Sequence, residues 1–311
     1  MSSVKTSPVG APPRRSKRRA TAARVGDARL AWILIAPSVL GFLVFAAYPA
    51  IRGVYLSFTD YRVLSAPEWV GLKNFQELMG DDKFWGSLGV TIQFVILTVA
   101  LTMIVSIASA VILHRVTSST LIRSIVILPF LISNVVAAVV WSWMLDRQLG
   151  IVNIALEALG NDSIGFLSDR GWVVPTLAVI TVWKTAGYTT ILVFAGLQTI
   201  PPQIYEAGKL DGASEVAMFR RLTLPLLRPI LAMVLVLTVI GAFQVFDIVQ
   251  VSTKGGPANA SLVLQMYIYD KAFGQFDFGY ASAMSLVLFV MLIVISFAQM
   301  RLLRASESDQ N

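Results

Sequence analysis

Six apolar segments, each long enough to cross a lipid bilayer, constrain this chain more than any other feature of its sequence. A membrane-spanning helix needs about 20 mainly apolar residues. The composition agrees, because 56% of the 311 residues are hydrophobic and only 14% are charged. The sequence therefore predicts an all-α integral membrane protein with six transmembrane helices, at approximately 30–51, 87–113, 122–144, 173–198, 229–251 and 280–300.

The basic residues indicate how the chain is oriented in the membrane. Most of the 25 Lys and Arg residues lie in the two tails and in the segments that follow the second and fourth spans. Because basic residues concentrate on the cytoplasmic side, both termini and the segment 199–228 are expected there. The chain then divides into a basic, disordered cytoplasmic tail (1–29), a transmembrane domain (30–304) and a short cytoplasmic tail (305–311). We interpret the charge of the first tail as a topology signal that contacts anionic membrane lipid, with no role in binding nucleic acid.

Several classes of chemistry are not expected in this chain. Cysteine is absent and His114 is the single histidine, so a thiol nucleophile, a multi-histidine metal site and a nucleophile–histidine–acid triad are all disfavoured. A phosphate-binding loop is missing, since Gly208-Lys209 is followed by Leu210. We therefore expect no catalytic residue, no metal and no cofactor in this chain. ATP and magnesium, if they are used, bind to a partner ATPase.

One long polar segment, 199–228, separates the fourth and fifth spans. Pro201 and Pro202 suit the first positions of a helix. Asp211-Gly212 is expected to end that helix, because glycine adopts the positive φ of a tight turn. Ser214 can then cap a second short helix.

The second helix should carry an apolar face of residues spaced three apart and end before the next span begins. The pattern thus predicts a helix-turn-helix outside the membrane, of a kind suited to docking in a groove on another protein. The residues that define this helix are Val216, Phe219 and Leu222 on its face, Pro225 at its end and Pro229 at the start of the fifth span.

The same segment resembles the EAA loop of bacterial ATP-binding-cassette importer permeases, whose pattern is E-A-A-x-x-x-G followed by I-x-L-P. Gly208 stands where the family usually has alanine, and Leu222 where it usually has isoleucine. Longer stretches, such as "WKTAGYTTILVFAGLQTIPPQIYEA" and "STKGGPANASLVLQMYIYDKAF", are similar to the carbohydrate-importer branch, and in particular to the first of its two permeases, the maltose, lactose and glycerol-3-phosphate type. The residues that match the EAA pattern are Glu206-Ala207, Asp211-Gly212-Ala213 and Leu222-Thr223-Leu224-Pro225.

The resemblance implies a transport subunit and not an enzyme, in the bacterial cytoplasmic (inner) membrane. It implies a heterodimer with a second permease, two ATPase subunits and an extracytoplasmic solute-binding protein. The substrate would be a sugar, such as a di- or oligosaccharide. The residues implied in ATPase coupling are Glu206, Ala207, Asp211, Gly212, Ala213, Phe219, Leu224 and Pro225.

Polar groups inside spans are expensive in hydrocarbon and usually face a cavity or another helix. The resemblance places the pathway mainly on the spans that flank the coupling loop, with aromatic rings to stack on sugars and glycines to leave room. The alternative is that these residues only pack helices together. The candidate pathway residues are Asn134, Trp183, Lys184, Gly187, Tyr188, Gly241, Gln244 and Asp247.

Lys184 leaves the substrate class open. Its ammonium could pair with Asp247, extend to the headgroups, or attract an anionic substrate of the glycerol-3-phosphate type. An ion-coupled secondary transporter is a different alternative, disfavoured because Asp247 is the one acid within a predicted span. A membrane enzyme would need a convergent nucleophile and base, which the scattered acids do not supply.

Overall fold

The computed structural model describes residues 32–63, 65–116 and 119–305. The predicted tail at 1–29 and all but the first residue of 305–311 lie outside that part. The chain forms two compact units, Met1–Tyr55 and Leu56–Asn311. In the first unit, residues 32–42 are helical and continue into π-helix η1 (Leu43–Ala47) and α2 (Tyr48–Leu56). Together they form a candidate span, Trp32–Leu56, as the sequence predicts.

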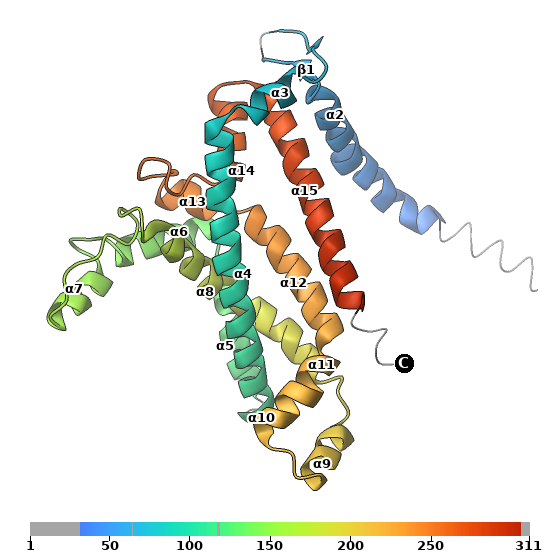
Figure 1. The fold of residues 1–311 in the computed structure, drawn as a ribbon, viewed down its shortest axis with the longest axis vertical. Helices are drawn as coiled ribbons and strands as arrows, with labels where there is room; N and C mark the ends of the chain where they lie inside the picture. Colours follow the sequence, from blue (N-terminus) through green and yellow to red (C-terminus); the bar gives the residue numbers. More distant parts are fainter. Residues whose placement is uncertain (1–31, 64, 117–118, 306–311) are drawn as a thin grey trace, which may run out of the picture. The chain divides into compact units, whose positions relative to one another are not determined.

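The second unit contains four further apolar helical spans (Figure 1). The longest, α4, has 35 residues, so its length of about 52 Å exceeds the roughly 30 Å hydrocarbon layer. These helices confirm the second, fourth, fifth and sixth predicted spans. Their bounds are Asp82–Val116 (α4), Val173–Leu197 (α8), Arg228–Phe243 (α12) continued by Asp247–Ser252 (α13), and Phe278–Ala305 (α15).

The third predicted span, 122–144, is not one straight helix. It consists of α5 (Thr120–Leu131) and α6 (Asn134–Met144), which meet at 90°. Pro129 lacks the N–H that would continue the hydrogen-bond ladder, and Ile132 and Ser133 adopt extended backbone angles between the two helices. The predicted apolar segment is therefore helical on both sides of a sharp bend, and with this bent pair counted as one span the described residues contain six.

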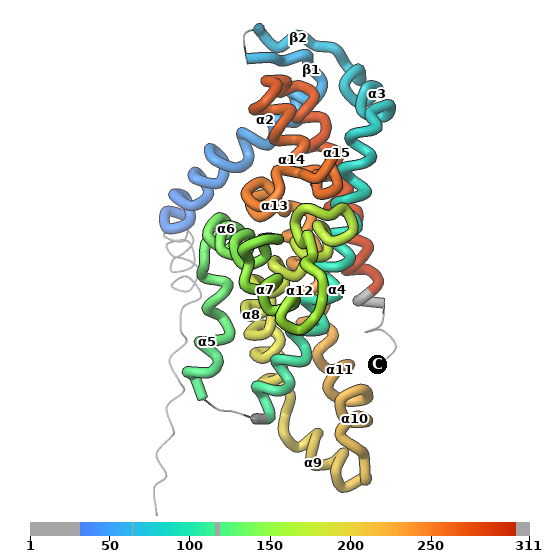
Figure 2. The backbone as a smooth tube through the Cα atoms, turned by 90° about the vertical axis from the view of Figure 1, so that its left-hand side faces the viewer, coloured from blue at the N-terminus to red at the C-terminus, as the bar shows by residue number. Residues whose placement is uncertain are grey.

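Short elements at one end of the second unit tie its helices together (Figures 1 and 2). The side-chain amide of Asn74 donates to the backbone carbonyls of Ser57 and Thr59, at 3.0 and 2.9 Å. Strands β1 and β2 pair antiparallel, with Thr59 opposite Trp69. The elements at this end are β1 (Thr59–Asp60), β2 (Glu68–Trp69), α3 (Lys73–Met79), α14 (Leu264–Tyr269) and π-helix η3 (Asp270–Gly274). Helix α7 (Ile151–Ala158) lies away from them, at the side of the unit (Figure 1).

The core of the second unit is formed by two separate apolar clusters. One surrounds Phe84, Leu177 and Met284, and the other surrounds Val193 and Leu227. Helix α8 contributes to the first cluster as far as Ile180 and to the second from Val193 onward. The buried residues in the middle of α8 therefore belong to neither cluster.

At the opposite end of the second unit, the segment after α8 forms the predicted helix-turn-helix (Figure 2). Gly212 has φ +74°, and the side chain of Ser214 accepts a hydrogen bond from the Ala217 amide at 3.3 Å. Both features confirm the predicted turn and cap. The elements are α9 (Pro202–Leu210), α10 (Glu215–Met218), π-helix η2 (Phe219–Thr223) and α11 (Leu224–Leu226).

Two details of the second short helix differ from the prediction. Helical structure continues past Pro225, although this proline has no N–H. Leu224, the residue before it, donates its backbone N–H to the carbonyl of Phe219 and so closes a π-helical turn. Val216 is 66% exposed and does not belong to the packed face, which is formed instead by Met218, 3% exposed.

Candidate functional site

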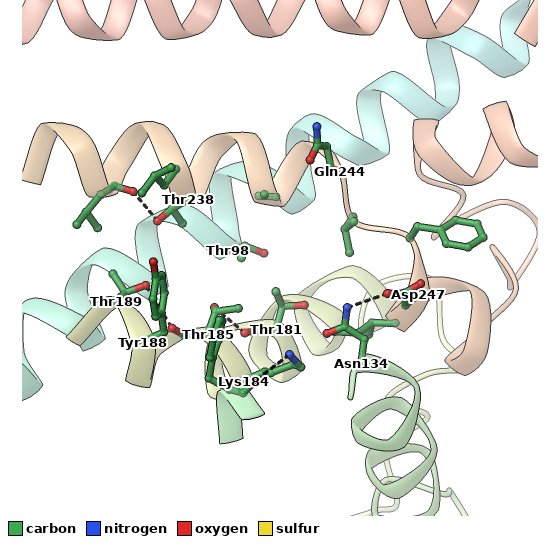
Figure 3. A pocket seen from close by; sticks show the side chains of 18 of the residues that line it. Thr98, Asn134, Thr181, Lys184, Thr185, Tyr188, Thr189, Thr238, Gln244 and Asp247 are labelled. Carbon is green, nitrogen blue, oxygen red and sulfur yellow. Dashed lines mark hydrogen bonds between the residues drawn. The ribbon is translucent and has the colours of Figure 1, made fainter. Parts of the chain in front are cut away.

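A cavity of about 240 Å³ lies beside the middle of α8, between the two core clusters. Its walls come from α4, α5, α6, α8, α12 and α13 and from the break between α12 and α13 (Figure 3). The fifth predicted span is interrupted at 244–246, and all three of these residues line the cavity. Non-helical backbone is tolerated at membrane depth where it borders a cavity.

Threonines form much of the polar lining (Figure 3). Thr181, Thr185, Thr189 and Thr238 each donate their hydroxyl proton to the backbone carbonyl four residues earlier, at 2.7–3.2 Å. Because the proton is used within the helix, the hydroxyl oxygen keeps its lone pairs to accept hydrogen bonds from a bound molecule. The cavity therefore presents a row of acceptors.

Thr98 on α4 differs from these four threonines. It is 2% exposed and lines the cavity, and its hydroxyl has no hydrogen-bond partner within the described residues. An unpaired buried hydroxyl costs about 1–3 kcal/mol. A ligand hydroxyl in the cavity would remove that cost.

Two charged side chains line the cavity, and they do not form a close pair. Asp247 accepts a hydrogen bond from the side-chain amide of Asn134 at 2.8 Å. Lys184 is 8% exposed, and its Nζ lies 3.4 Å from the carbonyl oxygen of Phe130 and 5.4 Å from the centre of that ring. Across the described residues, no ion pair within 4.0 Å joins Lys184 to a carboxylate.

An aromatic surface completes the lining. The rings of Tyr188 and Phe130 stack with centroids 4.6 Å apart and planes 14° apart. A stacked, partly exposed aromatic pair offers a flat apolar face beside the hydroxyl acceptors.

Six of the eight predicted pathway residues line this cavity: Asn134, Lys184, Tyr188, Gly241, Gln244 and Asp247. Gly241 has open space where a side chain would begin.

Trp183 and Gly187 lie outside the cavity lining. Trp183 packs edge-on against Trp141, at 5.4 Å between ring centroids. At Gly187, an added Cβ would collide with the carbonyl of Val126, so this glycine allows α5 and α8 to approach closely. Its position supports helix packing and not the predicted space for a ligand.

The sequence analysis did not identify these threonines as candidate site residues, although the spacing of three of them points to a shared helix face. Thr181, Thr185 and Thr189 follow one another at four-residue spacing, which places them on one face of a helix. Thr238 stands alone in its apolar span, and Thr98 is followed four residues later by Thr102, which does not line the cavity. Only the packing of α4 and α12 brings Thr98 and Thr238 to the same cavity.

The predicted coupling residues fall into two groups on the helix-turn-helix. Apolar Leu210, 89% exposed, projects beside them together with Val216, so the outward surface combines charged and apolar groups. Glu206, Ala207, Asp211 and Gly212 are exposed, whereas Ala213, Phe219, Leu224 and Pro225 are half-buried.

The helix-turn-helix is joined to the end of α4 by an ion pair. Arg115 Nη1 lies 2.7 Å from Glu215 Oε2, with both side chains about half exposed. A second cavity, of about 360 Å³, lies at this junction and is lined by His114, Tyr205 and Phe219 among others. Helix α10 is therefore in direct contact with the end of α4, the helix that also carries Thr98.

The two departures from the EAA pattern lie against each other. An added Cβ on Gly208 would be 3.0 Å from Cδ1 of Leu222. Gly208 thus makes room for the leucine that stands where the family usually has isoleucine.

At the opposite end of the second unit, the carboxylate of Asp81 links the start of α4 to α14 and α15 by hydrogen bonds. Asp81 accepts hydrogen bonds from the hydroxyls of Tyr267 and Tyr280, both at 2.7 Å, and from two backbone amides at the start of α4. Burial raises the pKa of Asp81, but these hydrogen bonds outweigh it, so the pKa lies below its usual value. Burial and the Asp81 carboxylate raise the pKa of Tyr267.

Within the described ranges, no group of three or more His, Asp or Glu residues is arranged to hold a metal ion.

Comparison with known proteins identifies the family. The model of the family described as "Binding-protein-dependent transport system inner membrane component" matches residues 102–308. The chain belongs to this family. It is a multi-pass inner-membrane permease, and relatives of known description are likewise permease subunits of transport systems.

Two relatives span almost the whole chain. The permease is 30% identical to the sulfoquinovosyl glycerol transport system permease protein SmoG of Agrobacterium fabrum, over 91% of this chain and 93% of that protein. It is 32% identical to the trehalose/maltose transport system permease protein MalF of Thermococcus litoralis, over 88% and 94%.

Solved structures agree in fold. The permease matches a chain of a bacterial ABC transporter that imports the acidic polysaccharide alginate, with a TM-score of 0.80, 25% identity, and coverage of 91% of this chain and 98% of that one. It matches a chain of the alginate transporter in complex with an alginate pentasaccharide-bound periplasmic protein with a TM-score of 0.79, 25% identity, and coverage of 89% and 94%.

Proposed function

We propose that this permease forms part of the transmembrane pathway of an ATP-driven, binding-protein-dependent importer of a di- or oligosaccharide. The observation that carries the proposal is the threonine-lined cavity at the middle of α8, in a chain of this transport family. Sugar hydroxyls donate hydrogen bonds, and the threonine oxygens are free to accept them. The stacked Tyr188 and Phe130 rings provide a flat surface for the apolar face of a pyranose.

The relatives support a saccharide substrate. Sulfoquinovosyl glycerol, trehalose, maltose and alginate, the substrates in the names of the matched proteins, are all glycosides or saccharides. A cavity of about 240 Å³ on one subunit is small for an oligosaccharide. A second permease facing this one would enlarge it, in a heterodimer with the pathway at the subunit interface.

The helix-turn-helix is the element that we assign to ATPase coupling. Its exposed Glu206, Leu210 and Val216 offer a charged and apolar surface to a groove on a partner. ATP and magnesium would bind to two copies of that partner, because this chain lacks a phosphate-binding loop. We assign this segment and both termini to the cytoplasm, because basic residues concentrate on that side of a membrane protein.

Closure of the two ATPases would move α9 and α10, and the Arg115–Glu215 ion pair would pass that movement to α4. The two permeases would then rock around the cavity and expose it alternately to each side of the membrane. A solute-binding protein would deliver substrate at the other end, as a periplasmic protein does in the alginate transporter complex.

The test is to express the permease with its partner ATPase, second permease and binding protein, and to identify the ligand retained by the binding protein by mass spectrometry. We expect a saccharide, together with ATP-dependent uptake of it by proteoliposomes that contain the complex. Omission of the permease should abolish uptake. A retained ligand that is not a saccharide, or uptake that persists without this chain, would refute the proposal.

A further inference from the structure

Lys184 lies too deep in the membrane to reach the lipid headgroups. It is the twelfth of the 25 residues of α8, which places it about 16 Å from one helix end and about 20 Å from the other, at 1.5 Å per residue. Four methylenes do not extend that far. The ammonium group must therefore be satisfied inside the protein or by a molecule in the cavity.

Inside the protein, Lys184 has only weak partners. Its ammonium carries three N–H donors, and the contacts found are the carbonyl of Phe130 at 3.4 Å and the face of the same ring. The other charged group of the cavity, Asp247, is bound to the amide of Asn134 and lies beyond ion-pair distance. Asp247 therefore attracts the ammonium group only from beyond 4.0 Å. A buried cation with no carboxylate in contact is unfavourable, so an anion in the cavity would stabilise it.

We propose that Lys184 is the anion-binding group of the cavity, and that the permeant saccharide carries an acidic group: a carboxylate, sulfonate or phosphate. This inference rests on the proposed saccharide import and goes beyond it by assigning the charge class of the substrate. The acidic group forms a charge-assisted hydrogen bond with Lys184. The hydroxyls of the same molecule donate to Thr181 and Thr185, which lie next to Lys184 on the cavity wall (Figure 3).

Because the chain has no cysteine, one introduced thiol can report how strongly Lys184 attracts anions into the cavity. A single Thr238→Cys substitution places a thiol on the opposite wall, on α12. The variant, assembled with its partner subunits in membrane vesicles, is treated with two methanethiosulfonates, one bearing a sulfonate and one bearing a trimethylammonium group. The ratio of the two labelling rates cancels the intrinsic reactivity of the thiol, and the complex without Thr238→Cys gives the background.

We expect Lys184→Met to lower the sulfonate-to-ammonium ratio on the order of tenfold, the effect of one nearby charge on two oppositely charged reagents. Lys73→Met, which removes an exposed charge on α3, is the matched control and should leave the ratio unchanged. A ratio that is equal in Lys184→Met and the control would overturn the proposal.

The competing hypothesis is that Lys184 and Asp247 stabilise each other electrostatically and that Lys184 binds no substrate. On that account, Lys184→Met lowers the melting temperature of the complex and the additional Asp247→Asn restores it. On ours, Lys184→Met leaves the melting temperature unchanged or raises it, because an unpaired buried charge is removed. A loss that the second substitution repairs would therefore overturn the proposal.

The identity of the ligand separates this inference from the proposed function. Mass spectrometry of the ligand from the binding protein should reveal a saccharide with an acidic group. A neutral saccharide would overturn the assignment of Lys184 and leave saccharide import intact. A ligand that is not a saccharide would refute saccharide import, and its charge would still decide the role of Lys184.

Discussion

Gly212 controls the angle between α9 and α10, and its replacement by valine should weaken ATPase docking without affecting insertion. Gly212 has φ +74°, a conformation that L-residues with branched side chains avoid. No atom lies within 4 Å of the position that a Cβ would occupy. The penalty of Gly212→Val is therefore conformational and not steric, at about 1–2 kcal/mol.

That strain can be relieved only if the turn changes. The amide of Ala213 bonds to the carbonyl of Gly208 at 2.9 Å, and the amide of Gly212 to that of Lys209 at 3.0 Å. Loss of these bonds would reorient α10 relative to α9. If the docked state needs the native turn, 1–2 kcal/mol corresponds to roughly 5- to 30-fold weaker binding.

The assay is equilibrium binding of the purified partner ATPase to vesicles that contain the permease pair. Gly160→Val is the matched control, because Gly160 has φ +83°, also has no atom within 4 Å, and follows α7, outside the helix-turn-helix. Gly212→Asn should retain most of the affinity, since asparagine tolerates positive φ. Equal ATPase affinity for Gly212→Val and Gly160→Val, at matched expression, would refute the role of this turn in coupling.

Three further outcomes are expected. Gly187→Ala should lower the free energy of unfolding by about 1–3 kcal/mol, measured by thermal unfolding, because the new Cβ would meet the Val126 carbonyl. The control Gly89→Ala, in open space on α4, should leave stability unchanged, and equal losses in the two variants would contradict the packing role of Gly187. Reversal of either charge of the exposed Arg115–Glu215 ion pair should lower uptake modestly, and reversal of both charges should restore it. If the double variant does not recover, uptake does not depend on this ion pair. The lowered pKa of Asp81 stabilises the fold at pH values above its ordinary pKa of 3.8, and this contribution is lost as pH falls through the lowered value. The melting temperature, measured across that pH range, should depend less on pH in Asp81→Asn than in the unsubstituted protein, and an unchanged dependence would contradict this.

Features that depend on the backbone needs of a short segment could be predicted from the sequence. The apolar spans follow from length and composition, because a helix that crosses hydrocarbon must satisfy its own hydrogen bonds. The end of α9, the positive φ of Gly212 and the Ser214 cap follow from residues within a few positions of one another. Two features of the predicted spans escaped prediction: the 90° bend at 132–133 and the interruption of the helix at 244–246.

The cavity was decided by tertiary structure. Lys184, Gly187 and Trp183 lie within five residues on one helix, yet only Lys184 lines the cavity, because α5 packs against Gly187 and Trp141 against Trp183. The pairing of Asp247 with Asn134, and not with Lys184, depends on the bend that brings the start of α6 to the start of α13. Sequence specifies which side chains are polar, whereas the helix faces that meet, set by packing between distant segments, determine which of them share a site.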